Sequence, residues 1–494
     1  MIPMTLAEIA SMTGARLTGS GVSGSAPDPG LVVEGPVDTD ARRLGPGGLY
    51  VARVGEHADG HDFVPQAVER GAVAALVTRE VSGLACLVVP DVQQAFERLA
   101  RAAVDRLPDV NVVAVTGSSG KTSTKDLLAQ LLTRLGPTVA SAESFNGEVG
   151  VPLTVLRATT DTRYLVVEMG ARGVGHIAHL TGIAPPTVSV VLNVGTAHLG
   201  EFGSVEGIAR AKSEIVTALP ADGLAVLNAD DPAVRAMAGV TDAAVVLVGQ
   251  SADAEVRVSE VTLDDSARPS FRIGVRSGGV LGLTQDDSAR VRLPLHGEHH
   301  VENAAQAAAV ALRLGMPLAD VAAALEQVQP VNRWRMQVTE RPDGVTVVND
   351  AYNANPDSMR AALKALAVMG RGRRTWAVLG EMLELGPDSV DEHDRIGRFA
   401  VRLNISRLVA VGQGARPIHT GAVQEGSWGE ESVLVPDADA AFALLADELR
   451  PGDVVLCKSS RDAGLRYLGD RLAEQPGDRT DPHQPAMDGK GRPA

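Results

Sequence analysis

The chain has 494 residues, a formal net charge of −15 and 45% hydrophobic residues. At roughly 150 residues per domain this length predicts about three domains, and the composition excludes a wholly disordered protein. The acidic balance argues against a general nucleic-acid-binding protein, because such proteins meet phosphates with an excess of lysine and arginine. No apolar run approaches the ~18 residues that cross a bilayer, and the N-terminus lacks the basic stretch of a secretory signal. We therefore expect a cytoplasmic protein that does not insert into membranes.

Residues 1–108 alternate short strands and helices and form the first predicted domain. Thr5 and Glu8 have the spacing of a capping box at the start of a helix. Further elements are predicted as strands at residues 49–51 and 74–77 and a helix at residues 94–106. Pro108 and Asp109 mark the expected boundary.

The second predicted domain covers residues 109–330. A buried strand at residues 112–115 runs into a glycine-rich turn and a helix from Thr122. Further apolar strands are predicted at residues 165–167, 188–192 and 225–227. Strands that alternate with helices indicate a parallel sheet. Alternating apolar and polar residues predict a small antiparallel patch added to that sheet, at residues 255–263, 270–275 and 290–295.

The pattern restarts near residue 331 and predicts a C-terminal Rossmann-like α/β domain over residues 331–474. Its strands are expected at residues 376–379, 408–411 and 454–456, and its helices at residues 359–368 and 392–403. Residues 475–494 are rich in proline, glycine and charge, and we expect a disordered tail there. Cys86 and Cys457 each lie in an apolar strand and are expected to be buried, reduced thiols.

The strongest chemical signal is the string T-G-S-S-G-K-T at residues 116–122, between a buried strand and a helix. In that setting backbone N–H groups and the helix N-terminus cradle phosphate, while Lys121 meets the β- and γ-phosphates and the Thr122 hydroxyl binds Mg²⁺. The string is a shortened form of the full P-loop pattern, because position 115 is valine. The predicted nucleotide-binding residues are Gly117, Ser118, Ser119, Gly120, Lys121 and Thr122.

Three polar residues follow later strands. Glu168 ends the strand at residues 165–167, His198 follows the strand at residues 188–192, and Lys212 lies on the next helix. The carboxyl ends of parallel strands gather around the ligand crevice, so Glu168 and His198 are candidate ligands of ATP-bound Mg²⁺. Each also has an ordinary alternative, which is an ion pair for Glu168, a loop hydrogen bond for His198 and a solvated helix position for Lys212.

Several strings, in this order, are similar to the Mur ligase family. They are the 116–122 string, N-G-E-V-G at 146–150, V-E-M-G-A at 167–171, A-H-L-G-E-F-G-S at 197–204 and A-K-S-E-I at 211–215. D-A-Y-N-A-N-P at 350–356, L-G-E-M-L-E-L-G at 379–386 and K-S-S-R at 458–461 resemble the branch of the family that adds D-alanyl-D-alanine. The resemblance spans residues 30–470, which is nearly the whole chain.

The resemblance implies an N-terminal domain for the UDP moiety, a central ATPase and a C-terminal domain that closes over ATP and the incoming dipeptide. In the N-terminal domain it implies substrate contacts from Asp40, Arg42 and His61, with Ala41 where the family has a hydroxyl residue. Asn303 takes the position associated with adenine, although His300 replaces the family's first asparagine. Arg335 takes the position of a phosphate-reaching arginine, with Trp334 in place of the usual glycine. Further implied residues are Asp350 for ribose and Asn146, Tyr352, Asn353 and Asn355 for substrate.

The implied reaction joins UDP-N-acetylmuramoyl-tripeptide and D-Ala-D-Ala at the expense of ATP, through an acyl phosphate, to make a peptidoglycan precursor. Catalysis is expected from Lys121, Glu168, His198 and Lys212, with two Mg²⁺ sites formed by Thr122, Glu168, His198 and Lys212. In the family the lysine at Lys212 is carbamylated by CO₂. A monomer is expected. Two alternatives stay open, namely a sister ligase of the folylpolyglutamate or cyanophycin type and an inactive nucleotide-binding homologue.

Overall fold

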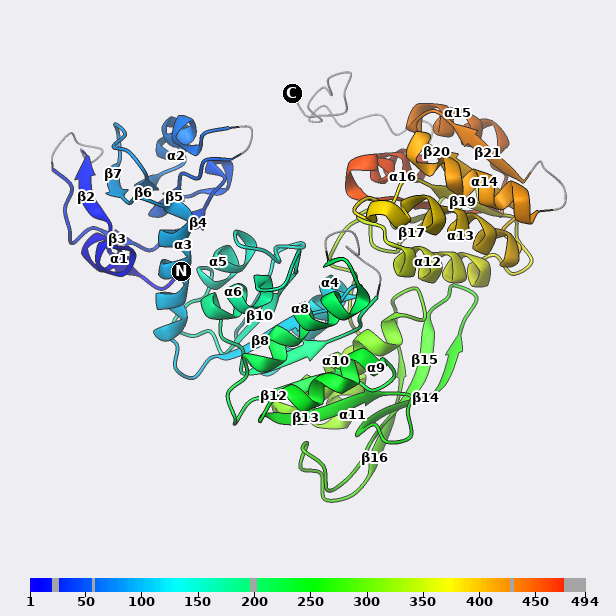
Figure 1. Cartoon of the computed structure of the whole chain (residues 1–494), viewed down its shortest axis with the longest axis horizontal. Helices are drawn as coiled ribbons and strands as arrows, with labels where there is room; N and C mark the ends of the chain where they lie inside the picture. Colours follow the sequence, from blue (N-terminus) through cyan, green and yellow to red (C-terminus); the bar gives the residue numbers. More distant parts are fainter. Residues whose placement is uncertain (20–25, 56–57, 196–201, 427–430, 475–494) are drawn as a thin grey trace. The chain divides into compact units, whose positions relative to one another are not determined.

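The computed structural model describes residues 1–19, 26–55, 58–195, 202–426 and 431–474 (Figure 1). The chain divides into two compact units. Unit 1 holds residues 1–264 and 268–331, and unit 2 holds residues 265–267 and 332–494. His198 and the tail predicted at residues 475–494 lie outside the described residues.

The first part of unit 1 is a five-stranded sheet with the order β2-β7-β6-β5-β4, in which only β2 is antiparallel to its neighbour. Its strands are β2 (Arg16–Gly19), β4 (Val37–Asp38), β5 (Gly48–Val51), β6 (Ala72–Val77) and β7 (Ala85–Val88). A two-stranded ribbon joins β1 (Met4–Thr5) to β3 (Val32–Val33), and the helices are α1 (Leu6–Thr13), α2 (Val64–Glu69) and α3 (Val92–Asp105). The capping box is confirmed, since Thr5 and Glu8 bond reciprocally at the start of α1.

The second part of unit 1 is a nine-stranded sheet with the order β16-β15-β14-β13-β12-β11-β8-β10-β9. The parallel strands are β8 (Asn111–Thr116), β9 (Thr138–Ala140), β10 (Tyr164–Glu168), β11 (Val188–Val191), β12 (Leu224–Asn228), β13 (Ala244–Gly249) and β14 (Val256–Leu263). β15 (Pro269–Val275) and β16 (Asp287–Arg292) continue the sheet in antiparallel pairing. The antiparallel patch is therefore an extension of the parallel sheet, as predicted.

Helices cover both faces of this sheet, so alternate residues of one strand enter different cores. Ala114 packs in the core that holds α5 (Gly150–Val155), α6 (His176–Ile183) and α8 (Val205–Thr217). Its neighbour Val115 packs in the core that holds α4 (Lys121–Thr133), α10 (His300–Arg313) and α11 (Leu318–Leu325). Burial on both faces explains why the parallel strands are continuous apolar runs.

Unit 2 holds a six-stranded sheet with the order β17-β18-β22-β19-β20-β21, parallel except for β17. Its strands are β17 (Gln337–Glu340), β18 (Thr346–Asn349), β19 (Thr375–Leu379), β20 (Arg407–Val411), β21 (Ser432–Val435) and β22 (Val454–Lys458). Its helices are α12 (Pro356–Met369), α13 (Ser389–Arg402), α14 (Arg416–Glu425), α15 (Ala438–Glu448) and α16 (Leu465–Ala473).

Two element boundaries differ from the prediction for local reasons. The helix expected at residues 94–106 begins at Val92, because the Asp91 side chain accepts the Gln94 amide as an N-cap. The strand expected at residues 290–295 is β16 and ends at Arg292, two residues before Pro294, which has no N–H to give to a sheet.

Both cysteines are buried and unpaired, as predicted. Among the helices of the described ranges, none combines the length and apolar character that spanning a bilayer requires.

Candidate active site

The glycine-rich loop joins β8 to α4 and is tied to the next strand of the sheet. The Ser118 amide donates to the carbonyl oxygen of Asn193 (3.1 Å), and the Ser119 amide donates to Oδ1 of the same residue (2.9 Å). Nζ of Lys121 lies across the loop and donates to the carbonyl oxygen of Gly117 (2.6 Å). Asn193 was not predicted as a site residue. Its place directly after the strand at residues 188–192 was the signal that could have found it.

Gly120 ends the loop in the left-handed region, with φ +81°. A Cβ at this position would lie 2.6 Å from Oδ1 of Asn303, which is on α10. The structure thus brings the predicted nucleobase residue Asn303 against the predicted phosphate loop.

We expect Gly120→Ala to lower the free energy of unfolding by about 1–2 kcal/mol, the usual cost of a left-handed conformation for a residue with a Cβ. It should also weaken ATP binding, because the Asn303 side chain must move away from the loop. Chemical denaturation and calorimetric titration with ATP measure the two effects. Gly239→Ala is the matched control, since its Cβ would meet open space. Equal stability and ATP affinity in the two variants would contradict the prediction.

Glu168 lies at the end of β10, beside β8, and is almost completely buried. Its Oε2 accepts from the Thr122 hydroxyl and its Oε1 accepts from Nδ2 of Asn146, both at 2.8 Å. The hydroxyls of Thr122 and Ser144 are 3.1 Å apart, and the Glu168 amide donates to Oγ of Ser141 (3.1 Å). Three predicted residues therefore meet here, together with two serines that were not predicted.

This cluster has the donor chemistry of a Mg²⁺ site. Carboxylate and hydroxyl oxygens are hard ligands, and Mg²⁺ is usually held by one or two carboxylates together with substrate phosphates. In the described ranges, no group of three or more His, Cys, Asp or Glu residues is arranged to hold a metal. Thr122 and Glu168 fit a metal whose remaining ligands come from a nucleotide and water.

Lys212 lies on α8 with its side chain buried, and only 5% of the residue is exposed. Burial, helped by the positive charge of Lys121, lowers the pKa of its amine to about 7. It is therefore not the solvated helix lysine that the sequence left open. Glu214, two residues further on, has a structural role, because its carboxylate accepts the amides of Gly175 (2.6 Å) and Ala178 (2.9 Å) at the start of α6.

A row of buried polar side chains runs along α10 from its first residue. His300 is buried, and burial together with the charges of His299 and His296 holds the pKa of its imidazole well below the usual range. Within the described part of the chain, Nδ1 of His300, Nδ2 of Asn303 and Oε1 of Gln306 are buried and have no hydrogen-bond partner. Buried polar groups are normally satisfied, so this row fits a polar ligand such as a nucleobase.

In the N-terminal sheet, the predicted residues form two separate arrangements. Asp40 and Arg42 pair at the surface, with Nη2 of Arg42 2.9 Å from Oδ2 of Asp40. His61 is buried, and its Nε2 accepts the Thr78 amide (3.0 Å). Nδ1 must then carry the ring proton and donates it to Asp59 (2.6 Å). The Arg42 side chain, although paired with Asp40, is mostly exposed and can be reached by a ligand. Both ring nitrogens of His61, in contrast, are bonded within the fold.

In unit 2, Asp350 follows β18 and both of its carboxylate oxygens have partners. Oδ2 accepts from Nζ of Lys458 (2.6 Å) and Oδ1 accepts from the Met336 amide (2.9 Å). Lys458, almost fully buried, also donates to the carbonyl oxygen of Asn353 (3.1 Å). Asn355 caps α12, because its side chain accepts the Ser358 amide (2.9 Å).

The Arg335 guanidinium lies 4.3 Å from the centre of the Tyr352 ring, and the Arg461 guanidinium lies 5.5 Å from the same centre. Tyr352 follows β18 and Arg461 follows β22, and these are neighbouring parallel strands. Two cations and an aromatic ring thus lie at the carboxyl ends of the strands, where doubly wound sheets bind ligands.

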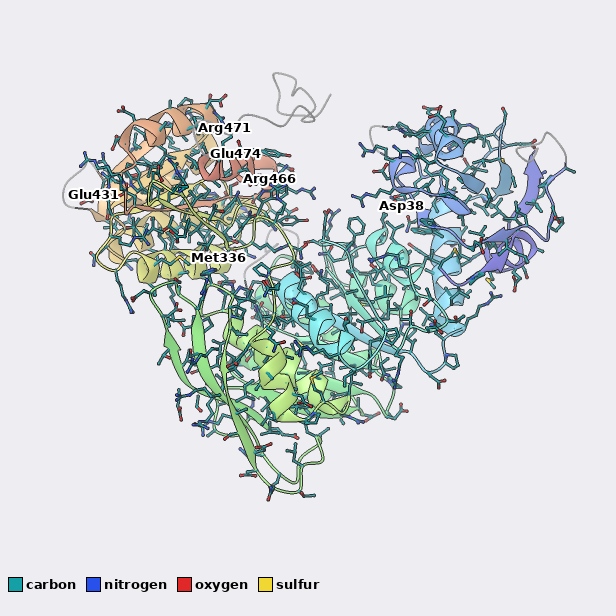
Figure 2. The ribbon with its side chains drawn as sticks, turned by 180° about the vertical axis from the view of Figure 1, so that it is seen from behind. Asp38, Met336, Glu431, Arg466, Arg471 and Glu474 are labelled. Atoms are coloured by element: carbon teal, nitrogen blue, oxygen red, sulfur yellow. The ribbon has the colours of Figure 1, made fainter. Side chains whose placement is uncertain are left out.

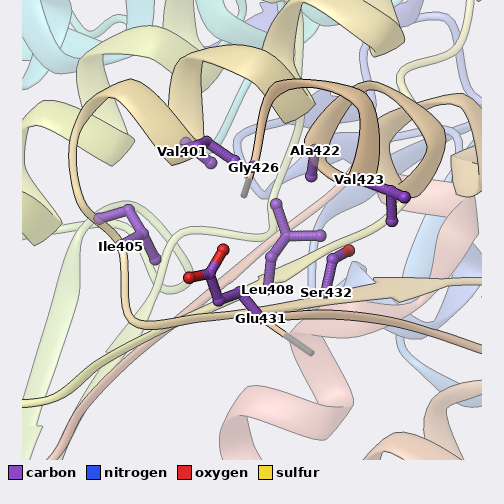
Figure 3. A pocket seen from close by; sticks show the side chains of 9 residues that line it. Val401, Ile405, Leu408, Ala422, Val423, Gly426, Glu431 and Ser432 are labelled. Atoms are coloured by element: carbon purple, nitrogen blue, oxygen red, sulfur yellow. The ribbon is translucent and has the colours of Figure 1, made fainter. Parts of the chain in front are cut away.

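Unit 2 also has a pocket among α13, α14 and β20, lined mainly by apolar side chains such as Ile405, Leu408 and Val423 (Figure 3). None of the predicted site residues lines it. It is therefore not the candidate active site.

The chain matches known protein families over most of its length. The family model described as the Mur ligase middle domain matches residues 115–311, the Mur ligase, glutamate ligase domain matches residues 334–461, and the Mur ligase family, catalytic domain matches residues 36–121. The UDP-N-acetylmuramoyl-tripeptide–D-alanyl-D-alanine ligase of Mycobacterium tuberculosis is 49% identical, over 96% of this chain and 98% of its own. The enzyme of the same name from Escherichia coli is 34% identical, over 96% and 99%.

Solved structures give the same result. A crystal structure of MurF from Acinetobacter baumannii matches with a TM-score of 0.82 and 32% identity, over 96% of this chain and 99% of that one. The MurF ligase from Thermotoga maritima in complex with ADP matches with a TM-score of 0.73 and 28% identity, over 89% and 97%. With a relative 49% identical along 96% of its length, the chain belongs to the Mur ligase family.

Proposed function

We propose that this chain is an ATP-dependent ligase that joins D-alanyl-D-alanine to the terminal carboxylate of UDP-N-acetylmuramoyl-tripeptide, forming a peptidoglycan precursor. The observation that carries the proposal is the bonding of the Thr122 hydroxyl to the buried carboxylate of Glu168, directly beside the phosphate loop. The substrates are proposed from the names of relatives that are 49% and 34% identical over nearly the full chain.

The chemistry requires activation of a carboxylate, because an amine cannot expel oxide from it. In the proposed reaction, a carboxylate oxygen of the tripeptide attacks the γ-phosphorus of ATP, the bond to ADP breaks, and an acyl phosphate forms. The dipeptide amine then attacks the acyl carbon, loses a proton, and phosphate leaves with the C–O bonding pair. Bound Mg²⁺ would lower the repulsion between the two anions that must meet in the first step.

Different residues of unit 1 are proposed to serve different parts of this reaction. Lys121 supplies a positive charge where the β- and γ-phosphates are expected, and the N-terminus of α4, at the end of the same loop, favours their negative charge. Asn146 donates to the Glu168 carboxylate, Ser141 accepts the Glu168 backbone amide, and Ser144 contacts the Thr122 hydroxyl. Asn303 and His300 are proposed to meet the nucleobase, and Arg42 the UDP moiety.

Two finer features are part of the proposal. The first is a second Mg²⁺ site formed by carbamylated Lys212 and His198. Carbamylation needs a neutral amine, and the pKa of about 7 supports a neutral Lys212 at physiological pH. The second is an N-terminal domain at residues 1–108, a central domain at 109–330 and a C-terminal domain at 331–474. The separate sheets and the change of compact unit at residue 332 support this division.

The deciding experiment is mass spectrometry of products formed from ATP, D-Ala-D-Ala and UDP-tripeptides that differ in their third, diamino-acid residue. We expect the mass of UDP-MurNAc-pentapeptide, and release of ADP only when both substrates are present. Ligation of glutamate or another amino acid instead would favour a sister ligase. Binding of ATP without any turnover would favour the inactive homologue. We further propose that the enzyme acts in the cytoplasm and is a monomer. Light scattering with the substrates present would check the monomer.

A further inference from the structure

The segment that leads into β17 has an unusual backbone. Trp334 has φ +61° and Met336 has φ +46°, on either side of Arg335. Bulky residues rarely adopt this left-handed region, and they remain in it only where their surroundings hold them there.

The side chain of Trp334 is fixed by the last helix, α16. Its indole Nε1 donates to both carboxylate oxygens of Asp470, at 3.0 and 2.9 Å. The guanidinium groups of Arg333 and Arg466 lie 5.0 and 5.5 Å from the centre of the Trp334 ring, and Tyr467 meets it edge-on. Figure 2 shows Arg466 and Met336 among the side chains of this unit.

Asp470 is itself held in place. It accepts from Nη2 of Arg333 (3.0 Å) and from Nδ2 of Asn349, the last residue of β18 (3.2 Å). The Trp334 indole therefore bonds to a carboxylate that is itself oriented by the last residue of β18. Each of these partners restricts the rotation of the Trp334 side chain.

The backbone on both sides of Arg335 is fixed as well. The Trp334 carbonyl accepts the Tyr352 amide (3.1 Å), and the Met336 amide donates to Oδ1 of Asp350 (2.9 Å). Between these two bonds, the Arg335 guanidinium lies over the Tyr352 ring at 4.3 Å. An arginine side chain has many rotamers, and holding its backbone at both ends reduces the freedom that binding must remove.

We propose that Trp334 and Asp470 are positioning residues that hold Arg335 over Tyr352, ready to meet an anionic group of the reactants. The inference rests on the proposed function, which supplies phosphate as that group. Trp334 and Asp470 touch no reacting atom in this account and act through Arg335. A misplacement of about 1 Å in such a group can cost on the order of a hundredfold in rate.

The test uses the full chain and a double-mutant cycle. Trp334→Phe keeps an aromatic ring but loses the N–H donor. Asp470→Asn removes the negative charge of the carboxylate to which both Trp334 and Arg333 donate. We expect either variant to lower kcat by about tenfold to a hundredfold, with less than about a threefold change in KM for ATP. In an Arg335→Ala background the same substitutions should lower kcat no further, because the residue they position is gone. Asp439→Asn, which removes a highly exposed carboxylate paired with Arg471 of α16, is the matched control and should leave kcat unchanged.

Hydrogen exchange of the Tyr352 and Met336 amides gives a readout that needs no activity. We expect faster exchange in both variants than in the wild type. The inference is overturned if exchange is unchanged, if folded variants keep wild-type kcat, or if they lose as much kcat in the Arg335→Ala background as in the wild type. If the wild type fails to ligate D-Ala-D-Ala while the Tyr352 and Met336 amides still exchange faster in the variants, that result contradicts the proposed function but supports the holding of the segment. If Trp334→Phe does not fold, Asp470→Asn alone decides by the same criteria.

Discussion

Lys121→Ala is expected to lower kcat/KM by about a hundredfold to a thousandfold, the effect typical of removing one group that stabilises charge in the transition state. Lys121 starts α4 at the end of the phosphate loop, and its Nζ donates to a loop carbonyl oxygen, that of Gly117. A bond of this kind contributes only about 1 kcal/mol, so the variant should remain folded. Steady-state kinetics and thermal denaturation of the same preparations measure both effects.

Two other lysines serve as comparisons. Lys364 is exposed on α12, and Lys364→Ala should leave both activity and stability unchanged. Lys125 is buried on α4, where its Nζ donates to the carbonyl oxygen of Ser141 (2.8 Å) and pairs with Asp126 (2.6 Å). Lys125→Ala should therefore lose stability, since it leaves polar partners buried without their donor. If Lys121→Ala loses as much stability as Lys125→Ala, or retains wild-type turnover, its assignment to phosphate is wrong.

Lys212→Ala is expected to retain less than about 1% of wild-type turnover, because it loses a group that helps to bind a catalytic metal. In the proposed site, the neutral amine adds to CO₂ and loses a proton, which yields an anionic carbamate. An uncharged or positive side chain cannot replace that ligand. Short-chain carboxylates such as formate or acetate should enter the space left by the side chain and restore part of the activity. Lys212→Arg, which introduces a permanent positive charge and cannot form the carbamate, should be inactive and should not be rescued.

The pH dependence of this step has a definite sign. Below pH about 7 the Lys212 amine is mainly protonated and cannot react with CO₂, and above it the amine is mainly neutral. At limiting bicarbonate, wild-type activity should therefore rise as the pH increases through about 7, and added bicarbonate should reduce the difference. Full activity of Lys212→Ala without any additive would refute the carbamate, as would wild-type activity that is insensitive to bicarbonate at every pH.

The burial of Lys212 also illustrates how a residue's chemistry depends on its surroundings. Its sequence neighbour Ser213 is only half-buried, and its hydroxyl donates to the carbonyl oxygen of Arg210 in its own helix. One position along α8 thus separates a half-buried hydroxyl from a buried amine of lowered pKa. A functional lysine of this type is identified by its environment and not by its residue type.

The sequence alone determined the features that depend on neighbouring residues. The strand–loop–helix context of residues 116–122, the alternation of strands and helices, and the capping box at Thr5 and Glu8 are all local patterns, and the structure has each of them. The ordered strings also indicated the family, because long motifs at fixed positions carry much more information than composition does. The prediction that Glu168 ends a strand near the phosphate loop was confirmed, since parallel strands align their carboxyl ends.

Tertiary structure decided which side chains are free to meet a ligand. His61 and Asn355 were predicted as substrate-binding residues, and the structure shows their side chains bonded within the fold, to Asp59 and Thr78 and to the Ser358 amide. Their substrate contacts remain predictions. Asn193 bonds the phosphate loop from 74 positions away in the chain. Asp470 holds Trp334 from 136 positions away. Such pairings, and the burial that lowers the pKa of Lys212, arise only when distant segments pack together, and no local pattern in the sequence specifies which segments will do so.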